Sequence, residues 1–111
     1  MKIDSVESQK IRVHALRRAH ERYGFRLSRR EYEEICKRAK SAPILDVTPE
    51  WRDIKVVVHR NTRMLVLWDV QTELVHTFFP WNSGWRAWYL DKEYRRNQSR
   101  LDVSPLNGAM T

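Results

Sequence analysis

The chain has 111 residues, of which 41% are hydrophobic and 32% charged, and its formal net charge is +7. These values are typical of one globular domain with a modest core, and no apolar run approaches the roughly 20 residues of a transmembrane helix. Residues 1–10 lack the basic start and apolar centre of a signal peptide, so we expect no membrane partner. Cys36 is the only cysteine, which excludes an internal disulfide and favours a reducing compartment, the cytoplasm.

Positive charge is concentrated in one segment. Lys10–Lys40 contains eleven Lys or Arg and four Glu, a surplus that accounts for the whole net charge. A field of this kind attracts polyanions, and nucleic acid is the first candidate partner, with RNA leading. The alternative is that these residues only solvate the outer faces of helices.

A first helix is predicted from an N-cap at Ser8 to about Tyr23, where Gly24 ends it in a left-handed conformation. Its core stripe is formed by residues at helical spacing: Ile11, Ala15, Leu16, Ala19 and Tyr23. A second stripe of hydrogen-bond donors borders the first and comprises His14, Arg18 and Arg22.

A second helix is predicted from Ser28 to about Lys40, because Ser28 and Glu31 have the spacing of a capping box. Pro43 closes it. Its inward residues are Tyr32, Ile35, Cys36 and Ala39. At this spacing Cys36 is interpreted as a small buried hydrophobe rather than a nucleophile.

Strand patterns follow the two helices. We expect a short edge piece, two longer strands joined by a turn at 60–62, and a last strand, with the ranges Ile44–Val47, Trp51–His59, Arg63–Trp68 and Leu74–Phe79. Asp69 and Thr72 favour a side-chain-capped turn before the last strand, and Pro80 ends the pairing. Met64 to Trp68 is almost continuously apolar, as in a central strand covered on both faces.

The C-terminal segment combines aromatic and basic residues. Residues 85–96 form either a short third helix or a further strand, and residues 97–111 are expected to be a flexible tail. The tryptophans could stack on unpaired bases while Arg86, Arg95 and Arg96 pair with phosphates. Alternatively, this extension docks on the domain or makes a homodimer contact.

These elements predict an α+β fold with two N-terminal helices packed on an antiparallel meander sheet of three to four strands. A Trp-rich C-terminal extension follows. We expect one domain over residues 1–96, in which residues 81–96 are the aromatic and basic extension.

Residues 11–80 resemble small phage and toxin proteins with the fold of the barnase, EndoU, colicin and RelE group of ribonucleases. The first part of the pattern is His14-Ala15-Leu16-x-Arg18-Ala19-x-Glu21-Arg22-Tyr23-Gly24-Phe25-x-Leu27-Ser28. The second part is Trp68-Asp69-x-x-Thr72-x-x-Val75-x-Thr77-x-Phe79-Pro80. The resemblance implies a metal-independent endoribonuclease without a cofactor, acting in the cytoplasm of a host cell if the gene belongs to a phage. It assigns the catalytic cleft to His14, Arg18 and Thr77, with Arg22 as a poorer match.

The implied reaction is attack of a ribose 2′-OH on the adjacent phosphate, which leaves a 2′,3′-cyclic phosphate. It needs a proton acceptor, a proton donor and positive charge at the phosphorus. Histidine ordinarily titrates near neutrality, so His14 suits the acid or base role, and the arginines suit the stabilising role. Nucleic-acid binding is further assigned to Arg17, Arg22, Arg29, Arg30, Arg86, Arg95 and Arg96.

The chain departs from the family pattern at two positions, with Glu73 where relatives often have Gly and His76 where an apolar residue is common. Strand alternation predicts His76 and Thr77 on opposite faces. No second acid–base group is securely placed beside His14, which could equally be a polar residue at the border of the helix core.

Two other functions remain open from the sequence. One is a non-catalytic nucleic-acid-binding module, and the other is a phage inhibitor that binds a host enzyme or defence complex. Metal-ligand motifs and phosphate-binding glycine loops are missing from the sequence, so no metal site is predicted.

Overall fold

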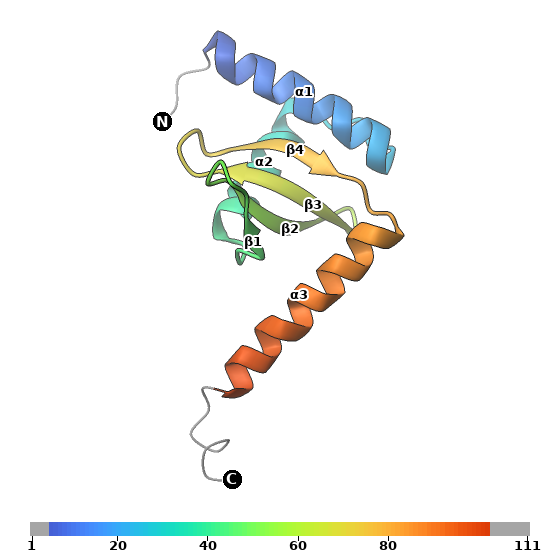
Figure 1. Cartoon of the computed structure of the whole chain (residues 1–111). Coiled ribbons are helices and arrows are strands. Elements are labelled where there is room, and N and C mark those ends of the chain that lie inside the picture. Colours follow the sequence, from blue (N-terminus) through green and yellow to red (C-terminus); the bar gives the residue numbers. More distant parts are fainter. Residues whose placement is uncertain (1–4, 103–111) are drawn as a thin grey trace. The chain divides into compact units, whose positions relative to one another are not determined.

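The computed structural model describes residues 5–102 and is α+β, with three helices and a four-stranded antiparallel sheet (Figure 1). The chain divides after Trp81 into two units, which are described separately. The first holds two helices and the sheet, and the second holds one helix. The predicted α+β class is therefore confirmed. Within residues 5–102 no helix combines the length and apolar character needed to span a membrane.

Helix α1 spans Val6–Tyr23 and begins one turn earlier than predicted. Its N-cap is Ser5, whose hydroxyl accepts a hydrogen bond from the Ser8 N–H at 3.1 Å, so the expected cap at Ser8 was wrong. Both serines have the chemistry of an N-cap, and the earlier one starts the helix. Gly24 ends it at φ 74°, as predicted.

Helix α2 spans Arg29–Ser41 and starts at the predicted capping box. Ser28 accepts from the Glu31 N–H at 3.1 Å, and the Glu31 carboxylate accepts from the Ser28 N–H at the same distance. The four residues predicted to face inward are all buried: Tyr32, Ile35, Cys36 and Ala39.

Four strands form a meander in the order β1-β2-β3-β4, with bounds Asp46–Val47, Asp53–His59, Thr62–Asp69 and Leu74–Phe79. Strand β2 begins two residues later than predicted, because Trp51 adopts φ 63° and belongs to the connection. Between β2 and β3, Arg60 and Asn61 have φ 50° and 60°, the left-handed pair of a two-residue hairpin turn.

One core joins α1 and α2 to the same face of the sheet. Ala15 and Ala19 are the small residues of α1 that let the helix approach closely, and Tyr32 and Ile35 fill the space beneath α2. The sheet contributes Val57, Met64, Val66, Trp68, Val75 and Phe78. On the other face Leu65 is fully buried, whereas Leu67 is half-buried and Arg63 is exposed, so the predicted cover on both faces holds only at the centre of β3.

Strand β4 contains a β-bulge. Leu67 pairs with Thr77, but the next residue, Trp68, pairs with Val75, which leaves His76 as an extra residue without a partner on β3. As a consequence Val75 and Phe78, three positions apart, both lie in the helix-side core. The strict alternation used to separate His76 from Thr77 therefore does not hold at this point of the strand.

Helix α3 spans Ser83–Asp102, which settles the alternative of a third helix or a further strand in favour of the helix. It continues beyond Arg96, where the sequence placed the start of a tail, and residues 103–111 lie outside the described part. Trp85 and Trp88 make an edge-to-face contact with ring centroids 5.5 Å apart. Lys92 Nζ lies 5.7 Å from the Trp88 ring.

Candidate functional site

The bulge in β4 is held by two side chains of α2. Tyr32 donates its hydroxyl hydrogen to the Val75 carbonyl oxygen at 2.7 Å. Cys36 Sγ accepts from the Val75 N–H at 3.3 Å. Burial raises the pKa of both side chains, so the thiol stays protonated and acts as a structural acceptor. The buried interpretation of Cys36 is confirmed.

Beside the bulge, four polar side chains form a connected group, named here the His76 cluster: Arg52, Asp69, Thr72 and His76. Asp69 Oδ2 lies 3.2 Å from Arg52 Nε and 3.7 Å from His76 Nε2. His76 Nε2 also makes a 3.0 Å hydrogen bond with Thr72 Oγ1. The side chains of His76 and Asp69 are each 14% exposed, so the imidazole and carboxylate are largely but not wholly removed from solvent.

Asp69 is fixed by the turn that connects β3 to β4. Its other oxygen, Oδ1, accepts from the N–H groups of Gln71 and Thr72 at 2.7 and 3.3 Å, which is the turn that the sequence predicts. The turn ends at Glu73 with φ 57°, a left-handed conformation that a glycine would adopt more readily. The carboxylate that organises the turn is thus also the one that faces His76.

The electrostatic surroundings of His76 oppose its protonation. Burial is the main cause that lowers the pKa of His76, and the positive charge of Arg52 adds to it. Asp69 acts in the opposite direction. Burial would raise the pKa of Asp69, but hydrogen bonds from Gln71 and Arg52 outweigh it and lower that pKa. An ionised carboxylate therefore lies beside a neutral imidazole near pH 7.

Helix α1 brings a second imidazole into the field of this cluster. His14 and Glu7 both act electrostatically on His76, with the His14 charge lowering and the Glu7 charge raising its pKa after the larger effects of burial and Arg52. His14 itself is exposed. It is one of the residues that line a shallow groove of about 350 Å³, together with Val6, Gln9, Lys10, Val13 and Arg17.

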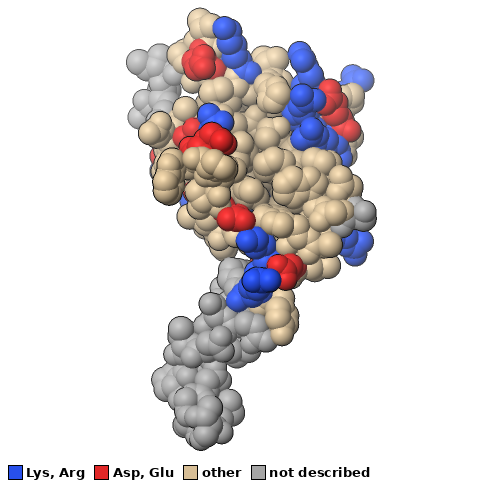
Figure 2. All heavy atoms as spheres, viewed as in Figure 1, with Lys and Arg blue, Asp and Glu red and all other residues tan. Residues whose placement is uncertain are grey.

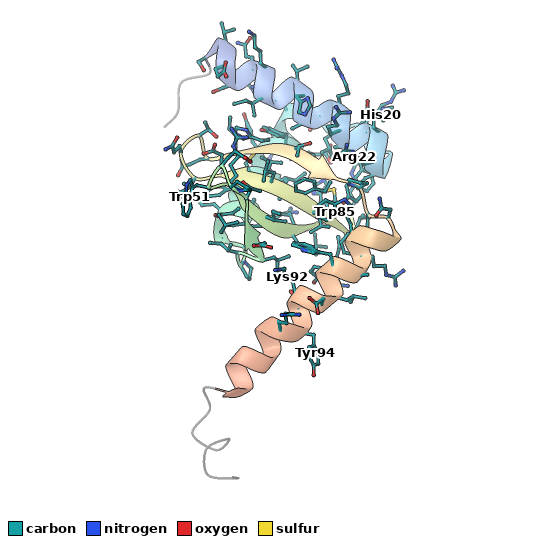
Figure 3. The ribbon with its side chains drawn as sticks, in the orientation of Figure 1. His20, Arg22, Trp51, Trp85, Lys92 and Tyr94 are labelled. Carbon is teal, nitrogen blue, oxygen red and sulfur yellow. The ribbon has the colours of Figure 1, made fainter. Side chains whose placement is uncertain are left out.

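The other residues assigned to the predicted cleft have different surroundings. Arg18 forms an ion pair with Glu21 at 2.6 Å on the surface of α1. Arg22 donates to the Phe78 carbonyl oxygen at 2.7 Å and so satisfies the backbone of the edge strand β4 (Figure 3). Thr77 pairs with Leu67 on the face opposite to the core residue Phe78, so the structure does not bring it together with His14.

The arginines assigned to nucleic-acid binding are distributed over both units. Arg29 and Arg30 are exposed and form ion pairs with Glu33 and Glu34 one turn along α2. Arg17 is exposed on α1. On α3, Arg86 is exposed and Arg95 pairs with Asp91 at 3.0 Å, whereas the side chain of Arg96 lies outside the described part. Figure 2 shows Lys and Arg side chains grouped near the end of α1, with acidic side chains beside them.

A second histidine cluster, formed by Glu31, His59 and Arg60, has a role in stabilising the fold. The Glu31 carboxylate accepts from His59 Nε2 at 2.8 Å and is held by both Arg60 Nε and Nη2, at 3.0 and 2.7 Å. The hydrogen bond from His59 is the main cause that lowers the pKa of Glu31 to about 2. These contacts tie the start of α2 to the β2–β3 turn, and they leave His59 only 7% exposed.

None of the four members of the His76 cluster was predicted as a site residue, although three of them had a local signal. Asp69 and Thr72 were recognised only as turn formers, and Arg52 immediately precedes a strand whose first residue, Asp53, pairs with Trp68. In an antiparallel pair that register brings Arg52 opposite Asp69. The bulge that places His76 beside them had no signal in the alternation of the strand.

Within residues 5–102, no group of three or more His, Cys, Asp or Glu side chains is arranged to hold a metal ion. Comparisons with protein-family models, with curated proteins and with solved structures found no match to this chain. The His76 cluster and its electrostatic relation to His14 define the candidate site.

Proposed function

We propose that the protein is an endoribonuclease that cleaves RNA by transphosphorylation and leaves 2′,3′-cyclic phosphate ends. The observation that carries the proposal is the Asp69–His76 pair, in which a carboxylate oxygen lies 3.7 Å from the imidazole Nε2. The charge of His14 has a smaller electrostatic effect on the same imidazole. Two imidazoles in one field can supply the general base and the general acid that this reaction needs. The sequence alone left that second group unassigned.

His76 is the proposed general base. The lowered pKa keeps its ring neutral near pH 7, as a proton acceptor must be. Asp69 and Thr72 both face Nε2, and the carboxylate favours the tautomer with the proton on that nitrogen. The lone pair is then on Nδ1, which takes the proton from the ribose 2′-OH.

His14 is the proposed general acid. As the 2′ oxygen bonds to phosphorus, the bond from phosphorus to the 5′ oxygen breaks, and protonated His14 gives its proton to that leaving oxygen. The products are a 2′,3′-cyclic phosphate and a free 5′-OH, so atoms and charge balance without a metal ion. An exposed position on α1 gives His14 access to solvent for reprotonation.

Positive charge around the phosphate is assigned to Arg52, with Lys10, Arg17 and Arg18 on the nearby stretch of α1. Arg52 uses Nε for Asp69, and a guanidinium has four further N–H groups to offer a phosphate. Thr77 is placed on the other face of the sheet by its pairing with Leu67, so the proposal gives it no catalytic role.

The resemblance to the barnase, EndoU, colicin and RelE group supports the proposal at the level of architecture. Two N-terminal helices and an antiparallel meander are the arrangement that the resemblance implies. Such a fold alone does not determine activity, which is assigned here to the two imidazoles. RNA in the cytoplasm is the proposed substrate, in keeping with the positive charge of Lys10–Lys40.

The test compares wild type with His14→Ala, His76→Ala and His20→Ala on total cellular RNA in EDTA, with fragment ends analysed for cyclic phosphate. His20 is an exposed imidazole on the same helix and serves as the matched control (Figure 3). Wild type and His20→Ala should cut, and each of the other two variants should lose about 10²–10⁴-fold in rate.

Intact RNA in all four samples would overturn the proposal. A salt-sensitive RNA complex without cleavage would then indicate the binding module, because log affinity falls linearly with log salt when phosphates are neutralised. A stoichiometric complex with a host protein and little RNA affinity would indicate the inhibitor. Equal loss of activity in all three variants, the His20→Ala control included, would contradict a specific role of His14 and His76.

A further inference from the structure

Trp51 is the most exposed of the large hydrophobic side chains in the described part of the chain, at 82%. It lies in the connection between β1 and β2 at φ 63°, a left-handed conformation that is unfavourable for a bulky residue. An indole directed into water gains no burial energy. Trp51 therefore has an unfavourable backbone conformation, and its ring does not stabilise the fold by packing in the core.

The conformation is held by hydrogen bonds that join Thr48 to Trp51 and Arg52. The Trp51 N–H donates to the Thr48 carbonyl oxygen at 2.9 Å, and the Thr48 N–H donates to the Arg52 carbonyl oxygen at the same distance. The Thr48 hydroxyl accepts from the Arg52 N–H at 3.2 Å. The closed loop keeps the backbone of Trp51 fixed while its ring stays in solvent.

The topology of the sheet brings this ring to the candidate site. In a meander the β1–β2 and β3–β4 connections lie at the same end, and Figure 3 shows Trp51 at that end. The next residue, Arg52, forms the ion pair with Asp69 and lowers the pKa of His76 after the larger effect of burial. The exposed aromatic face and the guanidinium assigned to the phosphate therefore belong to consecutive residues.

We propose that Trp51 is a stacking platform for an unpaired base of single-stranded RNA whose neighbouring phosphate is bound at Arg52. The inference rests on the proposed ribonuclease function and extends it to the substrate class. An aromatic face stacks on any base, and the adjacent guanidinium engages the backbone, so the site selects unpaired over duplex RNA without reading sequence. A base inside a duplex already stacks on its neighbours and cannot cover the indole.

The test measures binding of a short 2′-O-methyl oligonucleotide, which has no 2′-OH to react, by fluorescence anisotropy. The variants are Trp51→Gly, Trp51→Asn and Trp51→Phe. Gly and Asn both tolerate the left-handed backbone, so the variants remove the ring while keeping the loop. Binding should weaken by about 5- to 100-fold for Gly and Asn, and less for Phe, which keeps a smaller aromatic face.

An oligonucleotide with abasic sites is the control on the ligand side, because it keeps the phosphates and lacks the base faces. Wild type and Trp51→Gly should bind it equally. Equal binding of the base-containing oligonucleotide by wild type and Trp51→Gly would overturn the stacking platform. The same result is expected if the ring binds a protein partner instead of RNA.

Cleavage assays separate the two proposals. If wild type cuts RNA and Trp51→Gly cuts it with the same KM, the platform fails and the ribonuclease stands. If wild type leaves RNA intact but the variants lose base-dependent binding, the ribonuclease fails while the stacking site is supported.

Discussion

Asp69 holds its Oδ2 oxygen 3.7 Å from Nε2 of His76, while its other oxygen closes the turn that leads into the same strand. Turn and imidazole are therefore coupled through one carboxylate. Arg52 and Asp69 act on the pKa of His76 in opposite directions.

Replacing Arg52 or Asp69 by a neutral residue should shift the pKa of His76 in opposite directions. Arg52 lowers that pKa and Asp69 raises it, so Arg52→Gln should shift the imidazole titration to higher pH and Asp69→Asn to lower pH. Asn keeps an oxygen that can accept from the turn N–H groups. Following the His76 ring protons by NMR during a pH titration measures both shifts, and shifts of the same sign would contradict the assignment.

Removing the support of the bulge should cost stability. Tyr32→Phe deletes the hydroxyl that donates to the Val75 carbonyl oxygen inside the core. Both residues are buried, so the carbonyl oxygen loses this partner where water does not replace it. We expect a loss of about 1–3 kcal/mol in the free energy of unfolding, measured by urea denaturation. Tyr94→Phe on the exposed part of α3 is the control and should change it by less than about 0.5 kcal/mol.

The Tyr32→Phe variant should also loosen the site locally. Because the same hydroxyl holds the bulge, amide hydrogen exchange at Val75 and His76 should accelerate more than exchange in the centre of β3. Uniform acceleration throughout the sheet would mean that Tyr32 contributes only to global stability.

Glu31 should make stability depend on acidity. Its pKa is lowered from 4.5 to about 2 in the folded state, mainly by His59, so the unfolded chain binds a proton more readily than the folded one. The carboxylate therefore contributes stability that is fully present above about pH 4.5 and is lost as the pH falls toward 2. Thermal unfolding of wild type and Glu31→Gln is measured between pH 7 and pH 2. The Tm of wild type should exceed that of the variant at pH 7, and the difference in Tm should close on acidification.

A Tm difference between wild type and Glu31→Gln that is constant with pH would contradict the role of the Glu31 charge. Gln keeps the size and the acceptor oxygen of the capping box, so the two proteins differ mainly in that charge. Arg29→Gln is a useful companion variant, since Arg29 makes an exposed ion pair on the same helix at 3.2 Å. Such pairs contribute little, so this variant should follow wild type closely over the pH range.

Gly24 should tolerate Asn better than Ala. A Cβ added at this position meets no atom within 4 Å, so the cost of substitution comes from the backbone at φ 74° alone. Ala should destabilise the fold by about 1 kcal/mol, and Asn by less, because Asn enters the left-handed region more readily. Urea midpoints for the two variants measure the difference, and equal midpoints would show that the helix end relaxes.

Local chemistry explains which parts of the fold the sequence predicted. The capping box of α2 and the Asp69 turn depend on residues three positions apart, so their signals are complete within a few residues. The start of α1 was misplaced because Ser5 and Ser8 offer the same capping oxygen. No local rule distinguishes them.

The bulge and the site depend on contacts between distant segments. Tyr32 and Cys36 reach Val75 from about forty positions away in the chain, and period-two alternation assumes a ladder without an extra residue. His14 was selected by its place in a family pattern. Its relation to His76 emerges only when α1 lies along β4.

The extra residue of β4 is the one that carries the imidazole. A chain with one residue fewer at this position would have an unbroken ladder, with Val75 and Thr77 on alternate faces and a more regular hairpin. It would also have no ring facing Asp69. At position 76, therefore, selection for a more regular sheet and selection for the chemistry of the site would act in opposite directions.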